Sequence, residues 1–190
     1  MLMMWYTPCV INERGTTQMK SAGFVIGILI GLIVAVILLK YSNTNHRTKT
    51  QYDERQKELR GKAYQAGFYT MMIYEAILLV LEICEISLPV PGYILHFAGI
   101  ILGSLVLASC CIWMDVYWGL NNNRRRYGII FLVCGILNAI PVIGAVTHGG
   151  LLQNGGASVP VVNLLVLIMM FVIGGELLVK AFLDKREAEE

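Results

Sequence analysis

The chain has 190 residues, of which 56% are hydrophobic and only 15% are charged, and its mean hydropathy is +0.64. This balance excludes an ordinary soluble domain and is typical of a membrane protein. The formal net charge is +2, but the basic residues gather in a few short segments that membrane topology explains, so no nucleic-acid site is implied.

Five long apolar runs divide the sequence. A helix rises about 1.5 Å per residue, so about 20 residues cross the roughly 30 Å of hydrocarbon in a bilayer. The sequence therefore predicts an all-α fold, an integral membrane bundle of five transmembrane helices in a single membrane domain over residues 1–190. Its predicted parts are an outer tail at 1–21, spans at about 22–40, 67–87, 92–116, 127–147 and 159–180, a cytoplasmic helical stem at about 51–66 and a cytoplasmic tail at 181–190.

Lysine and arginine lie almost entirely on alternate connections between these runs. Seven of the fifteen lie in residues 40–62, three in 124–126 and three in 180–186, and the other two are Arg14 and Lys20. Cytoplasmic loops of membrane proteins carry the excess of Lys and Arg. The pattern therefore predicts the amino terminus outside and the carboxyl terminus in the cytoplasm.

The first twenty residues differ from the rest of the chain. Residues 13–15 can be encoded by a purine-rich stretch that resembles a bacterial ribosome-binding site, and Met19 follows three codons later, so we expect translation to start at Met19. The apolar run at 22–39 is longer than the roughly 7–15 residues of a signal-peptide core, and no small-x-small pattern follows it. An uncleaved anchor is therefore predicted.

Glycines recur at four-residue spacing in the first span, at Gly23, Gly27 and Gly31, and so lie on one side of its helix. Their missing side chains allow another backbone to approach closely, which predicts a packing face. The partner is either another helix of the same chain or a second copy. Gly99 and Gly103 repeat the spacing once in the third span.

The segment after the first span predicts a charged helix. Residues 50–53, Thr-Gln-Tyr-Asp, have the spacing of a capping box with Asp in place of Glu, so the helix is expected to begin near Gln51. No proline follows before Pro89, and the helix can continue into the second span as one rod. It serves either as a docking arm for a partner or as a solvated stem that sets the topology. Two acid-to-base pairs four residues apart lie on its surface, Asp53 with Lys57 and Glu58 with Lys62.

The stretch Tyr52-Asp53-Glu54-Arg55-Gln56, followed by Arg60-Gly61-Lys62-Ala63-Tyr64-Gln65 beside a span, resembles a family of uncharacterised small multi-pass membrane proteins of Gram-positive bacteria. The resemblance covers residues 52–65 and the general hydropathy plan. Members of that family are often encoded beside helix-turn-helix transcriptional regulators, which implies a regulatory or accessory role in a bacterial plasma membrane. The family has no assigned catalytic residues to carry over.

The second span carries the strongest chemical signal. Glu75, Glu82 and Glu85 fall within about an 80° sector of one helix, because seven residues advance nearly two full turns. Glu75 is predicted near mid-bilayer, where an ionised side chain costs up to about 2.5 kcal/mol, so the stripe must face protein or water. The glutamate stripe has two interpretations. In the first it carries protons or lipophilic cations. In the second Glu75 is a structural partner of Asn138 or of a hydroxyl, and Glu82 and Glu85 lie at the membrane interface. His96 is placed to meet Glu82 or Glu85.

Other polar residues have structural explanations. Asp115 is expected to form an interfacial ion pair near the arginines, and Glu176 to pair with Lys180 one turn later. Asn138 precedes Pro141, which predicts a kink in the fourth span with the amide bonding the carbonyl that proline frees or a neighbouring helix. Topology explains the three arginines, which could also contact anionic lipid headgroups: Arg124, Arg125 and Arg126.

These features favour a non-enzymatic integral membrane protein of accessory or regulatory function, whose stem and tail contact partners. The alternative is a small proton-coupled or cationic-compound transporter that uses Glu75, with a candidate ion or proton site of Glu75, Glu82, Glu85 and Asn138. We expect no cofactor and no metal, because no cysteine has a CxxC or Cys/His spacing. The expected partners are membrane lipids, a second copy or another membrane protein, and a cytoplasmic regulator.

Overall fold

The computed structural model of the chain describes residues 29–86, 88, 90–148, 150, 152–153, 156–157 and 160–189. Within these residues the fold is all-α, with five helices and one hairpin of two-residue strands. The chain forms two compact units, residues 1–48 and 49–190. The predicted start at Met19 and the packing glycines Gly23 and Gly27 lie outside the described residues.

Four helices are long and apolar enough to cross a membrane. At most 22% of the residues in the most apolar stretch of each are buried inside the protein, so these helices turn apolar side chains outward. A helix that is hydrophobic around its circumference needs such a surface covered, and a bilayer covers it. The four are α2 (Glu54–Ile83), α3 (Gly92–Trp113), α4 (Arg124–Thr147) and α5 (Pro160–Glu187).

The first unit is described from Leu29 onward. Its helical segment Leu29–Ser42 is shorter than a span, and the predicted first span at about 22–40 begins outside the described residues. The Ser42 hydroxyl donates to the Leu38 carbonyl oxygen at 2.7 Å in the last turn. Among the described residues of its own unit, a Cβ added at Gly31 would meet no atom within 4 Å, and the packing face predicted for this glycine stays a prediction.

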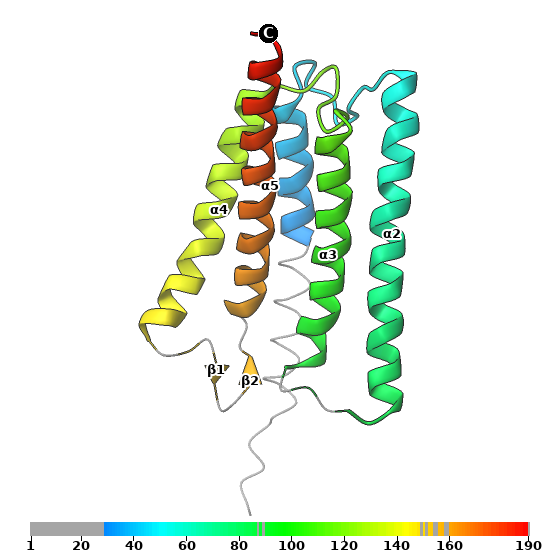
Figure 1. Cartoon of the computed structure of the whole chain (residues 1–190). Coiled ribbons are helices and arrows are strands. Elements are labelled where there is room, and N and C mark those ends of the chain that lie inside the picture. The colour runs from blue at the N-terminus through cyan, green and yellow to red at the C-terminus, as the bar shows by residue number, and fades with distance from the viewer. Residues whose placement is uncertain are drawn as a thin grey trace, which may run out of the picture. The chain divides into compact units, whose positions relative to one another are not determined.

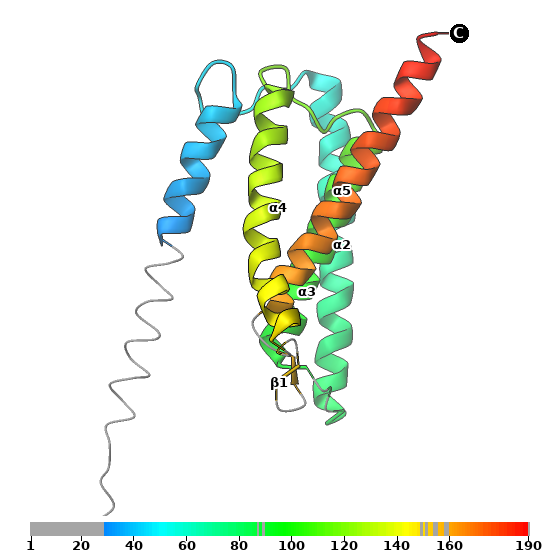
Figure 2. The same ribbon diagram turned by 90° about the vertical axis from the view of Figure 1, so that its left-hand side faces the viewer.

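In the second unit the four long helices stand in one row, in the order α2, α3, α5, α4 (Figure 1). α2 packs along α3, and α5 packs against both α3 and α4. Seen from the side, α5 runs obliquely to α4 (Figure 2). In the connection between α4 and α5, β1 (Leu152–Gln153) pairs antiparallel with β2 (Gly156–Ala157).

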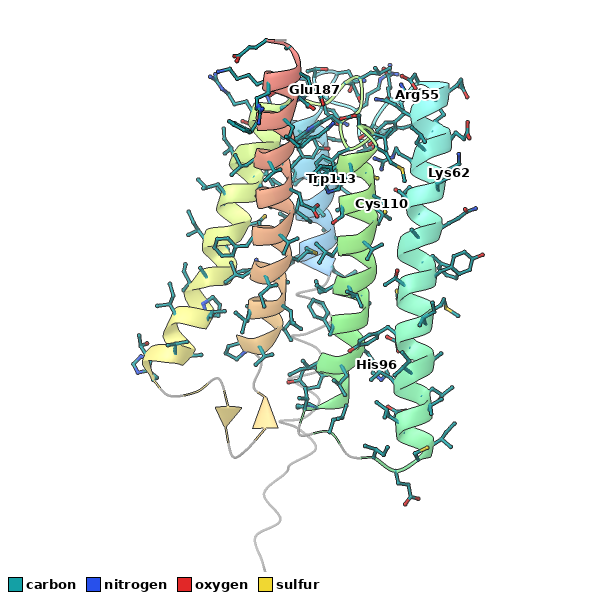
Figure 3. The ribbon with its side chains drawn as sticks, in the orientation of Figure 1. Arg55, Lys62, His96, Cys110, Trp113 and Glu187 are labelled. Atoms are coloured by element: carbon teal, nitrogen blue, oxygen red, sulfur yellow. The ribbon has the colours of Figure 1, made fainter. Side chains whose placement is uncertain are left out.

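The two inner helices of the row, α3 and α5, run in the same direction, and the outer helices α2 and α4 run in the opposite direction, so the starts of α2 and α4 lie at the same end as the ends of α3 and α5. Every Lys and Arg of residues 49–190 belongs to this end, which we call the basic end. Arg55 and Lys62 mark it in Figure 3, and His96 lies toward the opposite end. Two buried clusters hold the basic end together: Ala63 with Cys111 and Val116, and Ala108 with Ile112 and Ile173.

Helix α2 begins three residues later than the sequence predicted. Its N-cap is Asp53, whose carboxylate accepts from the Gln56 backbone N–H at 2.6 Å, while Gln56 Oε1 accepts from the Asp53 N–H at 3.3 Å. Gln51 is held outside the helix, because its N–H donates to Asn121 Oδ1 at 2.7 Å and its carbonyl accepts from the Leu120 N–H at 2.8 Å. The capping box exists, but the predicted register was wrong.

From its cap the helix runs without a break to Ile83, so the stem and the second span are one rod. The Glu58–Lys62 pair forms at 2.9 Å. Lys57 pairs with Glu54 at 2.6 Å instead of with Asp53, because Asp53 is occupied as the cap.

Two further boundaries differ from the prediction. α4 begins at Arg124 because Asn123 caps it, accepting the Arg126 backbone N–H at 3.1 Å, so the three arginines form its first turn instead of a preceding loop. α5 continues to Glu187, through most of the segment predicted as a tail.

α2 and α3 approach most closely at Gly67 and Gly103. A Cβ on Gly67 would lie 2.7 Å from the Gly103 carbonyl oxygen, and one on Gly103 would lie 2.9 Å from that of Gly67. Only glycine fits at such distances, which is how small residues let membrane helices pack closely. Gly99, one turn before Gly103, lies against Tyr74 and Glu75 of α2.

Candidate functional site

The candidate site lies where α2 and α3 meet, toward the end opposite the basic end. Glu75 Oε2 is 2.8 Å from His96 Nδ1, and Glu82 Oε1 is 3.8 Å from His96 Nε2. The imidazole on α3 thus stands between two carboxylates that lie about two turns apart on α2. Figure 3 shows His96 between the two helices.

Gly99 makes room for this arrangement. A Cβ at Gly99 would lie 2.7 Å from Glu75 Oε1 and 2.6 Å from Cδ1 of Tyr74, so the carboxylate and the ring both rest against the α3 backbone. The site is not sealed, because 35% of the Glu75 side chain, 51% of the His96 side chain and 64% of the Glu82 side chain remain exposed. Ionisable groups are therefore presented on the outer surface of two apolar helices.

Glu75 and His96 can hold one proton between them. With that proton the pair carries no net charge, and without it one negative charge remains, which is costly in apolar surroundings. The arrangement can therefore take up and release a proton, or hold a cation beside Glu75 and Glu82. It has no geometry for a metal ion: among the described residues, no three His, Cys, Asp or Glu side chains gather as a metal site requires.

Glu85 does not belong to this group. α2 ends at Ile83, Cys84 is its C-cap, and Glu85 follows with a left-handed φ of 54°. The prediction that three glutamates share one helical face was therefore wrong for Glu85, because the helix ends before reaching it. The imidazole expected to meet Glu82 or Glu85 meets Glu82 and, at shorter distance, Glu75.

Asn138 is not part of the site either. Its Nδ2 donates to the Cys134 carbonyl oxygen of its own helix at 2.8 Å, and α4 stays helical across Pro141. The predicted bond to the carbonyl that proline frees, that of Leu137, is not made. In the row of helices α4 stands at the end opposite α2, so the amide and Glu75 do not meet.

The predicted ion pairs at the basic end are rearranged. Lys180 Nζ lies 3.0 Å from Asp115 Oδ1 and 3.0 Å from Asp184 Oδ1. Asp115, with a left-handed φ of 60° after the end of α3, thus pairs with α5 and not with the arginines of α4. Glu176, the expected partner of Lys180, has instead a buried Oε2 without a hydrogen-bond partner in the described part of the chain.

Sequence reasoning missed one polar centre, which is built around Arg60. This half-buried guanidinium donates to the Val116 carbonyl oxygen at 3.0 Å and lies 4.1 Å above the Tyr52 ring. The available signal was an arginine four residues before Tyr64 and eight after Tyr52, in a helix that also buries Ala63.

No protein-family model, no curated protein and no solved structure matches this chain. Its function therefore has to be inferred from the geometry of the two polar centres and the charge distribution between the two ends.

Proposed function

We propose that the chain is a non-enzymatic, multi-pass integral membrane protein of accessory or regulatory function. It has five spans, with the amino terminus outside and the carboxyl terminus in the cytoplasm of a bacterium. The gathering of Lys and Arg at one end supports this orientation. The resemblance of residues 52–65 to small bacterial membrane proteins supports the plasma membrane as its location.

The observation that carries the accessory function is the fixed stem of α2. Ala63 is fully buried against Cys111 and Val116, and Arg60 donates a hydrogen bond to the Val116 carbonyl oxygen. One face of the stem therefore packs against the end of α3. The stem is thus not a free arm. Its other face presents two exposed ion pairs, Glu54 with Lys57 and Glu58 with Lys62. A charged surface that is already rigid loses little conformational entropy when a protein partner binds it.

A photo-reactive amino acid placed at position 58 should form an adduct with a partner protein in the native host, whereas the same amino acid at position 69 should not. Both positions are exposed on α2, but Glu58 lies in the charged stem and Tyr69 in the apolar part. Adducts are read by size on denaturing gels and identified by mass spectrometry. Charge reversal at Lys57 and Lys62 should weaken the adduct at 58; a chain that is present in normal amount but gives no protein adduct at 58 contradicts the proposal.

The second candidate is a proton-coupled or cationic-compound transporter. The group of Glu75, His96 and Glu82 favours it, because titratable side chains on membrane-length helices are usually tied to ion or proton movement. α2 stands at the edge of the row, so a second copy is needed to enclose the exposed group in a pathway.

Glu75→Gln separates the two functions, because glutamine keeps the shape and hydrogen-bonding capacity of the side chain but cannot ionise. If the group moves protons or cations, pH-driven uptake of a lipophilic cation into liposomes should be lost in Glu75→Gln and retained in the stem variant Glu58→Gln. The measurement uses purified, folded protein at equal density in each preparation. Equal uptake in all three proteins, or none in any, rules out the transporter and leaves the accessory function.

A further inference from the structure

A cavity of about 120 Å³ opens at the basic end, between the start of α2, the end of α3 and the connection to α4. We propose that it binds the phosphate group of an anionic phospholipid. The site is separate from Glu75 and His96 and goes beyond the accessory and transport functions. Its volume is far above the roughly 10–15 Å³ that a single water needs, so it has room for a group of several heavy atoms.

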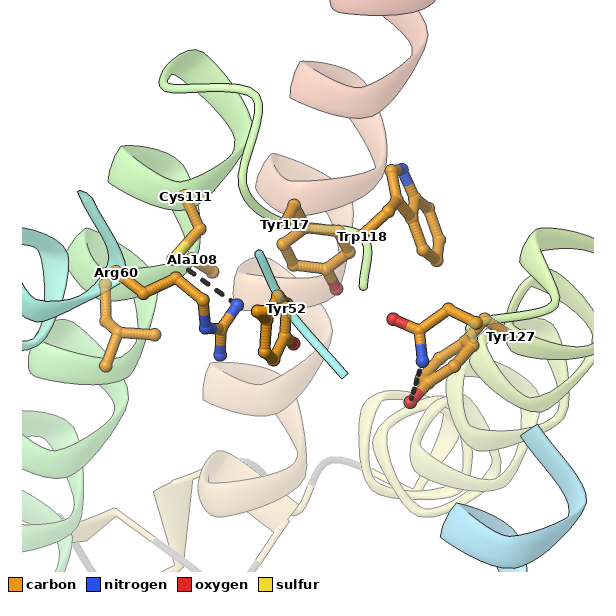
Figure 4. Close-up of a pocket in the computed structure, with 9 residues that line it drawn as sticks. Tyr52, Arg60, Ala108, Cys111, Tyr117, Trp118 and Tyr127 are labelled. Carbon is orange, nitrogen blue, oxygen red and sulfur yellow. Dashed lines mark hydrogen bonds between the residues drawn. The ribbon is translucent and has the colours of Figure 1, made fainter. Parts of the chain in front are cut away.

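Three tyrosines surround the cavity. In Figure 4 the phenol oxygens of Tyr52, Tyr117 and Tyr127 turn toward the space between their rings. Tyr127 accepts a hydrogen bond from Asn122 Nδ2 at 3.4 Å, which leaves its own hydrogen to donate. The hydroxyls of Tyr52 and Tyr117 have no hydrogen-bond partner among the described residues. The cavity is therefore lined by hydroxyl groups that can donate to an acceptor placed inside it.

The protonation state of the tyrosine hydroxyls favours binding of an anion. Burial raises the pKa of Tyr52 above its ordinary value, against the opposing effect of the nearby Arg60 guanidinium. Burial likewise raises the pKa of Tyr117, with the neighbouring Tyr127 adding to the shift. Both phenols thus stay neutral donors at physiological pH, and hydrogen bonds from such donors to an ionised oxygen are shorter and stronger than those between neutral groups.

The positive charge at the cavity is not balanced by a carboxylate. Arg60 donates only to neutral groups, the Val116 carbonyl oxygen at 3.0 Å and the Tyr64 hydroxyl at 3.3 Å, and more weakly to a cysteine sulfur. Within the described residues it forms no ion pair. A second guanidinium, that of Arg124, does not line the cavity but lies 5.6 Å from the ring centroid of the lining residue Trp118. A guanidinium and several hydroxyl donors around one space, without an acidic lining residue, favour a bound anion.

The position of the cavity points to a lipid. It lies at the end of membrane-length helices, among Tyr117, Trp118 and Tyr127, and such aromatic residues settle at the level of the headgroups. Lipid phosphates occupy the same level. A headgroup with net negative charge is favoured over a choline headgroup, because the choline cation would lie close to the Arg60 guanidinium.

The test uses the purified full chain in a neutral detergent. Short-chain phosphatidylglycerol, short-chain phosphatidylcholine and inorganic phosphate are each titrated, and binding is followed by tryptophan fluorescence and by native mass spectrometry. Phosphatidylglycerol should bind with one tight site and phosphatidylcholine at least about tenfold more weakly. The variant Tyr52→Phe/Tyr117→Phe should lose about tenfold or more in affinity for phosphatidylglycerol, the scale of lost hydrogen bonds to a charged group.

The phenylalanine variant should fold normally, because the deleted hydroxyls have no partner in the described residues, whereas Arg60 also supports the fold and is a less clean target. Tyr69→Phe, exposed on the apolar part of α2, is the matched control and should bind like the unchanged chain. Binding of inorganic phosphate alone, with the same sensitivity to the double variant, supports the phosphate site and overturns the lipid as its source. Equal binding of both lipids, or unchanged affinity in the double variant, overturns the site.

Discussion

Replacing Gly67 by Ala is expected to destabilise the chain by about 1–3 kcal/mol, whereas the same replacement at Gly61 should stabilise it by up to about 1 kcal/mol. A Cβ at Gly67 would lie 2.7 Å from the Gly103 carbonyl oxygen and 2.9 Å from Leu107 Cβ, so α2 and α3 must separate to admit it. A Cβ at Gly61 would meet nothing within 4 Å, and there alanine only improves helix propensity. Thermal unfolding of the purified variants in one detergent measures both changes.

Gly103→Ala provides the reciprocal check, since its Cβ would lie 2.9 Å from the Gly67 carbonyl oxygen. It should lower the melting temperature as Gly67→Ala does. The double variant should lose less stability than the sum of the losses in the two single variants, because separating the helices once makes room for both methyl groups. Indistinguishable melting temperatures for the changes at 61 and 67 would show that α2 and α3 do not touch at these glycines.

The lengths of the apolar runs predicted the long helices well because they depend only on local composition. α3, α4 and α5 each cover most of their predicted spans, and α2 carries the stem into the second span without a break. Helix length and hydropathy follow from neighbouring residues along the chain. The arrangement of the helices in one row involves pairs far apart in sequence, and nothing in the spans' composition specifies it.

The residue at which α2 starts depends on a contact with a residue far away in the sequence. Both Thr50 and Asp53 have a side chain suited to an N-cap, and the sequence offers a possible N3 partner for each. Asn121, seventy residues away from Gln51, decides between them by accepting the Gln51 N–H. Its amide also donates to the Lys49 carbonyl oxygen at 3.1 Å, which keeps this segment outside the helix.

Only part of the candidate site was predictable from the sequence. Glu75 could be singled out because a carboxylate in an apolar run is costly wherever the run lies. Its pairing with His96 depends on how α2 turns into α3 between Ile83 and Gly92, and that turn also removes Glu85 from the helical face. Lys180 likewise prefers Asp115 across the α3–α5 contact to Glu176 one turn back on its own helix.

Labelling of introduced cysteines should give an all-or-none result for the orientation of the chain and for the number of its spans. In a chain whose five native cysteines are replaced, Cys at position 148 should react with a membrane-impermeant reagent in intact cells, and Cys at position 58 should react only after the cells are permeabilised. His148 and Glu58 are both exposed, at opposite ends of the second unit. The reason is the gathering of Lys and Arg at the basic end, because the cytoplasmic loops of membrane proteins carry the excess of these residues.

A third position decides between four and five spans. Cys at position 21, just before the first apolar run, should be labelled in intact cells if that run crosses the membrane, because position 58 on its other side is proposed to be cytoplasmic. Labelling of 21 only after permeabilisation would mean that the segment ending at Ser42 does not cross and that the chain has four spans. Labelling of 58 but not of 148 in intact cells would reverse the orientation. The fixed stem and the tyrosine-lined cavity would then face outside, where a cytoplasmic regulator could not reach the stem.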